Sequence, residues 1–295
     1  MRLDQHYTFH PVHYPTNYML SYRHAFHAGN HGDVLKHAVL ALIIEYMQRK
    51  EKPFMYIDTH AGAGRYDLHA DWAQKTREFE SGILPIWQRD DLPSDLLIYI
   101  EVIRQMNPAG ELWWYPGSPW LVRQLIRKQD KARLFELHSN EVQNLQDLFA
   151  NERGVKVENS DGLQSLKAIL PPLEHRALVL IDPSYEIKSD FKNAVSALKD
   201  AYRRFASGVY LLWYPVLNRT YTEQLENGFR SSSIRNILLA ELIIAPGQGM
   251  TGSGVIVINP PWTLKNQLQN ILPYLAKLIG QNGKGKYRIE TLVAE

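Results

Sequence analysis

Short apolar runs that end in polar residues recur along the chain and predict the strands of a sheet. The clearest is the continuous run 177–181, which Asp182 follows and which is typical of a buried strand. Similar runs cover 53–57, 133–138 and 155–157. Longer segments separate these runs, so the pattern predicts an α/β fold: a doubly wound, Rossmann-like sheet with helices on both faces.

The first two of these strands are separated by more sequence than a minimal nucleotide-binding unit needs. About 70 residues lie between Gly64 and Glu136, against a usual spacing of ~20. Within this stretch, residues 95–107 carry apolar side chains at helical spacing. We therefore expect a small helical insertion between the first two strands, at about 67–112, within one large domain.

The sequence after the run 177–181 suggests chemistry on an amine. Asp182, Pro183, Ser184 and Tyr185 stand where a doubly wound sheet presents its ligands, beyond the carboxyl end of a strand. A carboxylate and a carbonyl can each accept one N–H bond from an exocyclic amine, and an aromatic ring can stack on the base that carries it. An ordinary strand-to-loop turn is the alternative interpretation.

A glycine-rich turn follows the run 53–57, with the sequence Asp-Thr-His-Ala-Gly-Ala-Gly over residues 58–64. Glycines here allow a sharp turn and a close approach of the backbone to a ligand. A nicotinamide-binding loop would place a third glycine where Asp67 stands, and a P-loop would continue with Gly-Lys-Ser or Gly-Lys-Thr. The turn looks more like the loop that binds S-adenosylmethionine.

Two further acids follow strands in the same order. Glu136 lies near the end of the run 133–138, where an acid accepts hydrogen bonds from ribose hydroxyls. Asp161 and Gly162 follow the run 155–157, where methyltransferases commonly hold the adenine amino group, although a plain turn is the alternative. Four weak signals in the correct order favour a methyltransferase more strongly than any one of them.

Longer motifs make this resemblance specific. They are Ser21-Tyr22-Arg23-His24-Ala25-Phe26-His27-Ala28-Gly29-Asn30-His31-Gly32-Asp33-Val34-Leu35-Lys36-His37, Asp58-Thr59-His60-Ala61-Gly62-Ala63-Gly64-Arg65-Tyr66, Tyr115-Pro116-Gly117-Ser118-Pro119 and Trp213-Tyr214-Pro215. Over residues 19–295 the chain resembles the bacterial RlmJ family of 23S rRNA adenine-N6 methyltransferases. The resemblance implies a Rossmann-like class I methyltransferase that uses S-adenosylmethionine, without a metal, to make N6-methyladenosine in 23S rRNA.

The resemblance also implies site residues. Asp182, Pro183 and Tyr185 would carry catalysis, and Tyr22 and Tyr185 would contact the substrate base. The cofactor would be bound by residues from six parts of the chain: His37, His60, Gly62, Ser118, Glu136, Asp161, Gly162 and Asp182. Ser184 departs from the family's second proline, but the outer Asp and Tyr remain, so we expect activity. We expect residues 1–18 to be an extension before Met19, from an upstream start codon or from cloning.

The expected mechanism is direct methyl transfer to an adenine that has left its stack, with Asp182 and the Pro183 carbonyl accepting the two amine hydrogens. Other interpretations remain open. The chain could methylate another amine, namely DNA adenine, guanine N2 or a protein glutamine. It could be a nicotinamide oxidoreductase, which the incomplete glycine pattern disfavours, or a non-catalytic RNA-binding relict, for which Ser184 would be the sign.

Composition adds limits. The chain has 295 residues, a net charge of +2 and no cysteine, so disulfides and thiolate chemistry are excluded. No run of 18 apolar residues exists, and we expect a cytoplasmic monomer without a membrane segment. Seven of the histidines crowd the first 37 residues, but they lack a recognisable ligand spacing, so no metal site is expected. Because bulk charge is nearly neutral, RNA affinity must come from local basic groups, of which two stand out at 23–52 and 123–133.

A second tetrapeptide, Asn259-Pro260-Pro261-Trp262, matches the Asn-Pro-Pro-aromatic pattern of amine methyltransferases more closely than residues 182–185 do. It follows the apolar run 254–258 near the end of the chain. In a methyltransferase sheet the last strands pair as a hairpin, away from the cofactor. Position therefore favours Asp182.

Overall fold

An eight-stranded sheet organises the molecule. The computed structural model describes residues 23–187, 189–245 and 249–295, so the predicted extension 1–18 and Tyr22 lie outside the described residues. The strands of the main sheet are β1 (Met55–Asp58), β4 (Lys131–Phe135), β5 (Val155–Glu158), β6 (Ala177–Ile181), β7 (Val209–Val216), β8 (Ile237–Ile243), β9 (Gly252–Ile258) and β10 (Lys286–Val293).

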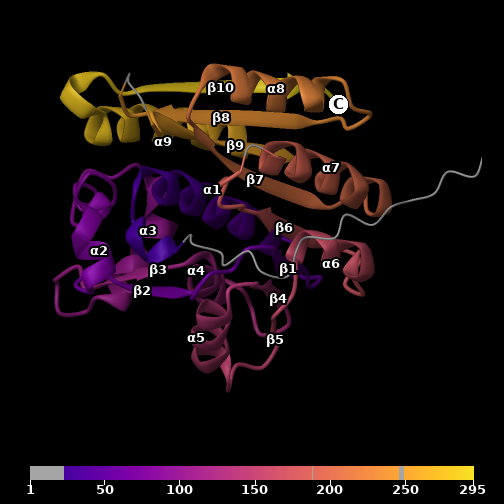
Figure 1. The fold of residues 1–295 in the computed structure, drawn as a ribbon, viewed down its shortest axis with the longest axis horizontal. Helices are drawn as coiled ribbons and strands as arrows, with labels where there is room; N and C mark the ends of the chain where they lie inside the picture. The colour runs from indigo at the N-terminus through magenta and orange to yellow at the C-terminus, as the bar shows by residue number, and fades with distance from the viewer. Residues whose placement is uncertain (1–22, 188, 246–248) are drawn as a thin grey trace, which may run out of the picture.

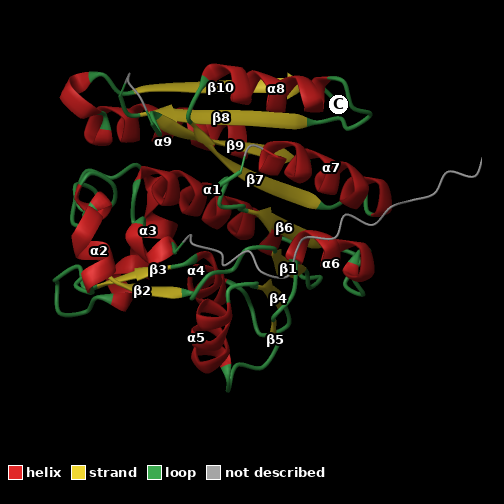
Figure 2. Cartoon of the chain, viewed as in Figure 1, coloured by secondary structure: helices red, strands yellow, loops and turns green. Residues whose placement is uncertain are grey.

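The strand order is β10-β8-β9-β7-β6-β1-β4-β5. The strands from β5 to β7 run parallel, whereas β9 is antiparallel to β7, β8 to β9, and β10 to β8. From β1 the chain proceeds outward on one side to β4 and β5, and it then crosses back to β6 on the other side of β1. This change in strand order beside β1 is the switch point where such sheets bind ligands. The predicted Rossmann-like class is confirmed (Figure 1, Figure 2).

Helices cover both faces of this sheet. They are α1 (His31–Gln48), α2 (Asp71–Thr76), α3 (Ser94–Met106), α4 (Ser118–Leu125), α5 (Ser139–Phe149), α6 (Gly162–Ile169), α7 (Ser189–Arg204), α8 (Arg219–Arg230) and α9 (Leu264–Ile279), with the 3-10 turns η1 (His24–Phe26), η2 (Glu78–Glu80) and η3 (Gln281–Gly283). Alternate strand residues feed two cores: Leu178 and Leu180 pack with α1, α3, α4 and α9, whereas Val179 and Ile181 pack with α6, α7 and α8. Burial of both faces explains why the strands read as continuous apolar runs.

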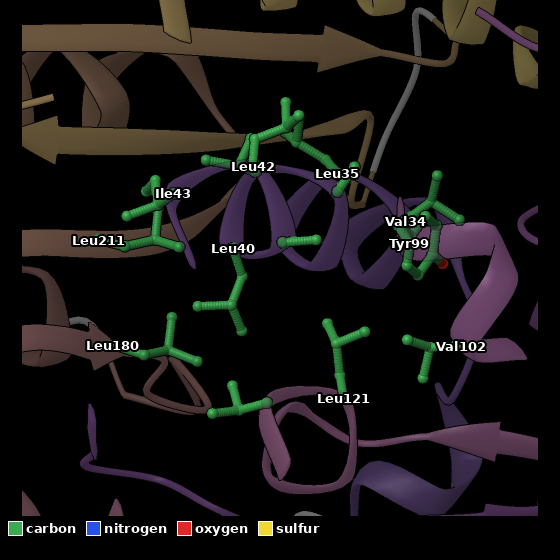
Figure 3. Close-up of a cluster of buried hydrophobic side chains, with 14 of the residues drawn as sticks. Val34, Leu35, Leu40, Leu42, Ile43, Tyr99, Val102, Leu121, Leu180 and Leu211 are labelled. Atoms are coloured by element: carbon green, nitrogen blue, oxygen red, sulfur yellow. The ribbon is translucent and has the colours of Figure 1, made fainter. Parts of the chain in front are cut away.

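Helix α1 lies at the centre of the first core. Its residues from Val34 to Ile44 are buried on every side, in contrast to the single apolar stripe of a surface helix. Leu40 points toward Leu180 of β6 and Leu121 of α4 in the close-up (Figure 3). Asn30 begins the helix by accepting the backbone N–H of Asp33 at 3.0 Å, which fixes the first turn. This rigid helix carries the charged residues that reach the site.

The segment between β1 and β4 is built on a small ribbon. Strands β2 (Arg65–Asp67) and β3 (Trp114–Pro116) pair antiparallel, and α2, η2 and α3 lie between them in sequence. Figure 1 shows this ribbon with α2 and α3 at the end of the molecule away from α8. Side chains of α3 share the core of α1. The segment therefore packs on the main sheet, and the limits 67–112 of a separate insertion stay a prediction.

The two candidate tetrapeptides lie at opposite ends of the strands. Asp182 follows the carboxyl end of β6, whereas Ile258, the last residue of β9, pairs with Tyr210 near the start of β7. The antiparallel direction of β9 thus carries Asn259 to the amino edge of the parallel strands. There its side-chain amide donates to the carbonyls of Ala206 and Gly208 at 2.7 and 2.8 Å. Asn259 therefore closes a turn at the edge of the sheet opposite Asp182.

Candidate active site

Four acids line the carboxyl edge of four adjacent strands. Asp182 follows β6, Asp58 ends β1, Glu136 follows β4, and Asp161 follows β5 by three residues. Because these strands are parallel neighbours, their carboxyl ends meet at one edge of the sheet. Strand order in the sequence predicted Glu136, Asp161 and Asp182 at strand ends, whereas Asp58 was expected only as part of the glycine-rich turn; the sheet brings all four to one edge.

Asp182 is held by a lysine from α1. The Nζ of Lys36 donates to Oδ2 of Asp182 at 2.6 Å and lies 2.9 Å from Oδ1 of Asp33. The side chains of Lys36, Asp33 and Asp182 are 4%, 1% and 14% exposed. Burial opposes the charge of Lys36, but the carboxylates of Asp182 and Asp33 outweigh it and raise the pKa of Lys36 above its usual value. The lysine is therefore a permanent cation that orients Asp182.

Asp33 links this pair to the first described residues. Its Oδ2 accepts the N–H of Gly29 at 2.9 Å and lies 2.8 Å from Nε2 of His24 in η1. Burial alone would raise the pKa of Asp33, but His24 and Lys36 hold it well below its usual value. A continuous line of contacts thus runs from His24 through Asp33 and Lys36 to Asp182.

Asp58 is a buried acid beside this line. Its Oδ2 accepts the hydroxyls of Tyr56 and Ser118, both at 2.7 Å, and its Oδ1 accepts the N–H of His60 at 3.2 Å. Burial raises the pKa of Asp58 to about 6 despite these donors, and the negative charge of Asp182 adds to the effect. Such a carboxyl gains from a cationic ligand, which would stabilise its ionised form.

The glycine loop and Glu136 form the next part of the site. Glu136 accepts the N–H of Gly62 at 2.8 Å through Oε2 and that of His138 at 2.7 Å through Oε1. Each carboxylate oxygen can accept a second hydrogen bond, so both remain available to ribose hydroxyls. Gly62 has φ +61°, a conformation that favours glycine.

Asp161 and Gly162 begin helix α6 beside the loop. Asp161 caps the helix through Oδ1, which accepts the N–H of Gln164 at 3.1 Å. A Cβ on Gly162 would lie 2.3 Å from the carbonyl oxygen of Thr59, so only glycine lets the helix approach the loop this closely. These contacts fit the nucleoside half of S-adenosylmethionine, and the acid row fits its positive charges.

Tyr185 is strained and anchored. Its φ is +54°, which costs roughly 1–3 kcal/mol for a non-glycine residue and is common at functional sites. The hydroxyl donates to the carbonyl of Trp213 at 2.6 Å, and the ring packs against Phe191 with centroids 4.4 Å apart. The residue is 7% exposed, so stacking on a base requires a change at this loop. Its substrate contact stays a prediction.

The two predicted histidines occupy different settings. His60 contacts Oγ1 of Thr59 at 2.8 Å on the glycine loop, and burial lowers its pKa. His37 points into the core, where its Nδ1 contacts the hydroxyl of Tyr115 at 3.0 Å and its Nε2 is buried without a described partner. Burial lowers the pKa of His37 to about 3, so its ring is neutral. The described contacts tie His60, but not His37, to the acid row.

Sequence reasoning missed three residues that the structure places at Asp182. Lys36 stood in the early basic group as an RNA contact, but it is 3% exposed and paired with two acids. Asp33 received no role. Trp213 stands in one of the motifs of the resemblance. Its ring centroid lies 5.9 Å from that of Tyr185 and 5.8 Å from Nζ of Lys36. Its Nε1 is buried without a described hydrogen-bond partner. All three stand in motifs that carry the family resemblance, and those motifs were the only signal, because the contacts themselves join distant parts of the chain.

The described residues contain no cluster of three or more His, Cys, Asp or Glu side chains that could hold a metal ion. Within the same ranges, each helix is too short or too polar to cross a membrane.

Comparisons with known proteins agree with this geometry. The family model described as "Ribosomal RNA large subunit methyltransferase D, RlmJ" matches residues 51–293. Ribosomal RNA large subunit methyltransferase J of Escherichia coli is 49% identical over 280 residues, which cover 94% of this chain and 100% of that protein. The protein of the same name from Haemophilus influenzae is 47% identical over 281 residues, with the same coverage.

A crystal structure of a Legionella pneumophila protein has a similar fold. It superposes with a TM-score of 0.85 at 40% sequence identity and covers 90% of this chain and 98% of its own. The family match and the two full-length relatives confirm the predicted family: the chain belongs to the RlmJ family of ribosomal RNA large subunit methyltransferases.

Proposed function

We propose that this protein transfers a methyl group from S-adenosylmethionine to the N6 amine of an adenosine in 23S rRNA. The observation that carries the proposal is the acid row beside the glycine loop, with Asp182 oriented by Lys36. Four carboxyl groups and one buried lysine suit a cationic ligand such as S-adenosylmethionine. They disfavour the anionic pyrophosphate of a nicotinamide dinucleotide, which binds at glycine-rich helix N-termini.

The residues divide the work between cofactor and base. Glu136 would accept the ribose hydroxyls, and Asp161, whose Oδ1 already caps α6, would offer Oδ2 to the adenine amine. Asp58 and Ser118 hold the loop at the sheet edge. S-adenosylmethionine, when bound, supplies the electrophilic methyl group. These groups need no metal ion for their role, and a metal-free reaction is part of the proposal.

Asp182 acts on the acceptor amine. Lys36 occupies Oδ2, so Oδ1 is left to accept one N6 hydrogen while the Pro183 carbonyl accepts the other. Two acceptors on the amine pull its lone pair out of conjugation and aim it at the methyl group. Alignment of this kind supplies roughly 7–11 kcal/mol of a reaction barrier, so no strong base is needed before attack. Asp182 then takes the proton that the methylated nitrogen releases.

The target base must leave its stack to reach Asp182, and Tyr185 would then hold it flat. Stacking on the ring would contribute about 1–3 kcal/mol. Tyr22 would contact the base from the segment before η1. Tyr22→Ala should lower RNA methylation while leaving cofactor affinity unchanged. If turnover per folded molecule stays normal, Tyr22 has no place in the substrate site.

A direct experiment tests the proposal. Ribosomal RNA from a deletion strain, with and without the gene restored on a plasmid, is mapped by mass spectrometry. One adenosine in 23S rRNA should lose a methyl group and regain it on restoration. Modified DNA adenine, guanine N2 or protein glutamine would redirect the assignment to another amine. Binding of adenosylhomocysteine without any methyl transfer would favour a relict. We also propose a cytoplasmic monomer, because ribosomal RNA is the proposed substrate and one chain supplies the described residues of the site.

A further inference from the structure

We propose that a cluster of two cations and two aromatic rings at the edge of the active site binds the nucleotides that flank the target adenosine. This rim cluster consists of Arg23, Phe26, Trp72 and Lys75. It rests on the proposed function, since it concerns how the RNA substrate is held. It lies outside the acid row and uses no residue of it.

The cluster joins two segments of the chain. Arg23 precedes η1, and its guanidinium lies 5.0 Å from the Trp72 ring centroid on α2. The Trp72 and Phe26 rings meet edge to face at 5.0 Å, and Nζ of Lys75 lies 5.8 Å from the Phe26 ring. The hydroxyl of Thr76 donates to the carbonyl of Phe26 and fastens η1 to α2. The order cation, ring, ring, cation is therefore fixed by contacts.

Continuity with the active site places the cluster beside the substrate. His24, the residue after Arg23, contacts Asp33, which contacts Lys36 and through it Asp182. The ring of His24 also packs 5.1 Å from that of Tyr66, whose hydroxyl accepts the N–H of Ala63 in the glycine loop. A nucleotide next to a base held at Asp182 would extend over this edge.

The chemistry of the cluster fits RNA with unstacked bases. Trp72 is 45% exposed, and Lys75 is exposed on the same short helix. When a target base leaves its stack, its neighbours lose a partner, and exposed aromatic rings replace it while cations contact the phosphates. One nearby acid, Glu78, is engaged by His27 and Asn30.

The test separates flanking contacts from catalysis. Trp72→Ala, Arg23→Gln and Lys75→Gln are compared with wild type for kcat and KM on in vitro transcribed 23S rRNA, and for the Kd of adenosylhomocysteine. Trp72→Ala should raise the KM for RNA about tenfold, which corresponds to about 1.4 kcal/mol. Loss of either cation should flatten the slope of log KM against log salt by about 0.7. The kcat and the cofactor Kd should stay at wild-type values.

Two controls keep the outcome decisive. Trp262→Ala removes a tryptophan that is 74% exposed at the opposite edge of the sheet, and Lys277→Gln removes an exposed cation of α9; neither should change KM. Trp72→Tyr keeps a ring and should restore much of the affinity. An unchanged KM in all three rim variants, or a fall in kcat without a rise in KM, would overturn the proposal. A wild-type protein that methylates no adenosine in the transcript would instead overturn the proposed function.

Discussion

Removal of Lys36 should destabilise the protein far more than removal of a surface lysine. In Lys36→Met the apolar stem is kept, but Asp33, 1% exposed, loses one of its two basic partners and keeps only His24, and Asp182 loses its hydrogen-bond donor. Breaking a buried ion pair from one side costs about 3–5 kcal/mol, because an uncompensated charge stays buried. We expect a loss of this size in the free energy of unfolding at pH 7, measured by urea denaturation. Lys50→Met, an exposed change just after α1, should cost less than about 0.5 kcal/mol.

The pH dependence of this loss identifies its cause. The folded pKa of Asp33 is depressed, so its stabilising contribution is present above the unfolded value of 3.8 and disappears as the pH falls through the folded value. The variant lacks the part of this contribution that Lys36 supplies and keeps the part from His24, so the gap between the two proteins should shrink at low pH. The double variant Lys36→Met with Asp33→Asn should recover part of the loss, since it removes the buried charge.

Two results would refute this reasoning. A loss below about 1 kcal/mol at pH 7 would mean that the pair behaves like a solvent-exposed ion pair. A double variant no more stable than the single one would assign the loss to packing of the lysine stem instead. The methylation assay on the same preparations should show little activity per folded molecule, because Asp182 would no longer be held in place.

Three further predictions follow from the site. Asp182→Ala should abolish methyl transfer and leave most cofactor affinity, whereas Asn259→Ala should cost about 1–3 kcal/mol of stability, from two hydrogen bonds, and little specific activity; the reverse pattern in a methyl-incorporation assay would exchange their roles. Glu136→Ala should weaken adenosylhomocysteine binding by about 1–3 kcal/mol in calorimetry, and tight NAD binding instead would contradict the cofactor assignment. The folded pKa of Asp58, about 6 against 3.8 unfolded, should make wild-type stability fall by about 3 kcal/mol as the pH rises through this window, and urea unfolding of Asp58→Asn should show no such fall.

The sequence predicted what depends on local pattern and strand order. The run before Asp182 is β6, and the acids at Glu136 and Asp161 follow β4 and β5 as expected. The choice of Asp182 over Asn259 also rested on strand order, and the antiparallel β9 places Asn259 at the other edge. In each case the inference needed only the ends of the strands, which apolar runs indicate, and the strand order expected for a methyltransferase sheet.

Contacts between distant parts of the chain could not be predicted in this way. Lys36 and Asp182 are 146 positions apart, and a lysine in a polar stretch gives no sign that it will be buried. The apolar run after His37 predicts a helix but not that every face of it is covered. The positive φ of Tyr185, which turns its ring toward Phe191, likewise depends on packing that the tetrapeptide does not encode.

The cations that cluster in the sequence are largely engaged in structure, and this changes where RNA attraction must arise. In the second basic group, Arg123 binds Glu152, Arg127 binds Asp130, and Arg133 binds Glu158. Because each of these arginines is paired with an acid, the group attracts a phosphate less strongly than its sequence suggests. Because these arginines are already paired, few phosphates can be neutralised by this group, and each phosphate contact contributes about 0.7 to 0.9 to the salt slope. Affinity for RNA should therefore depend on salt only weakly, and a steep slope would point to a basic surface beyond the rim cluster.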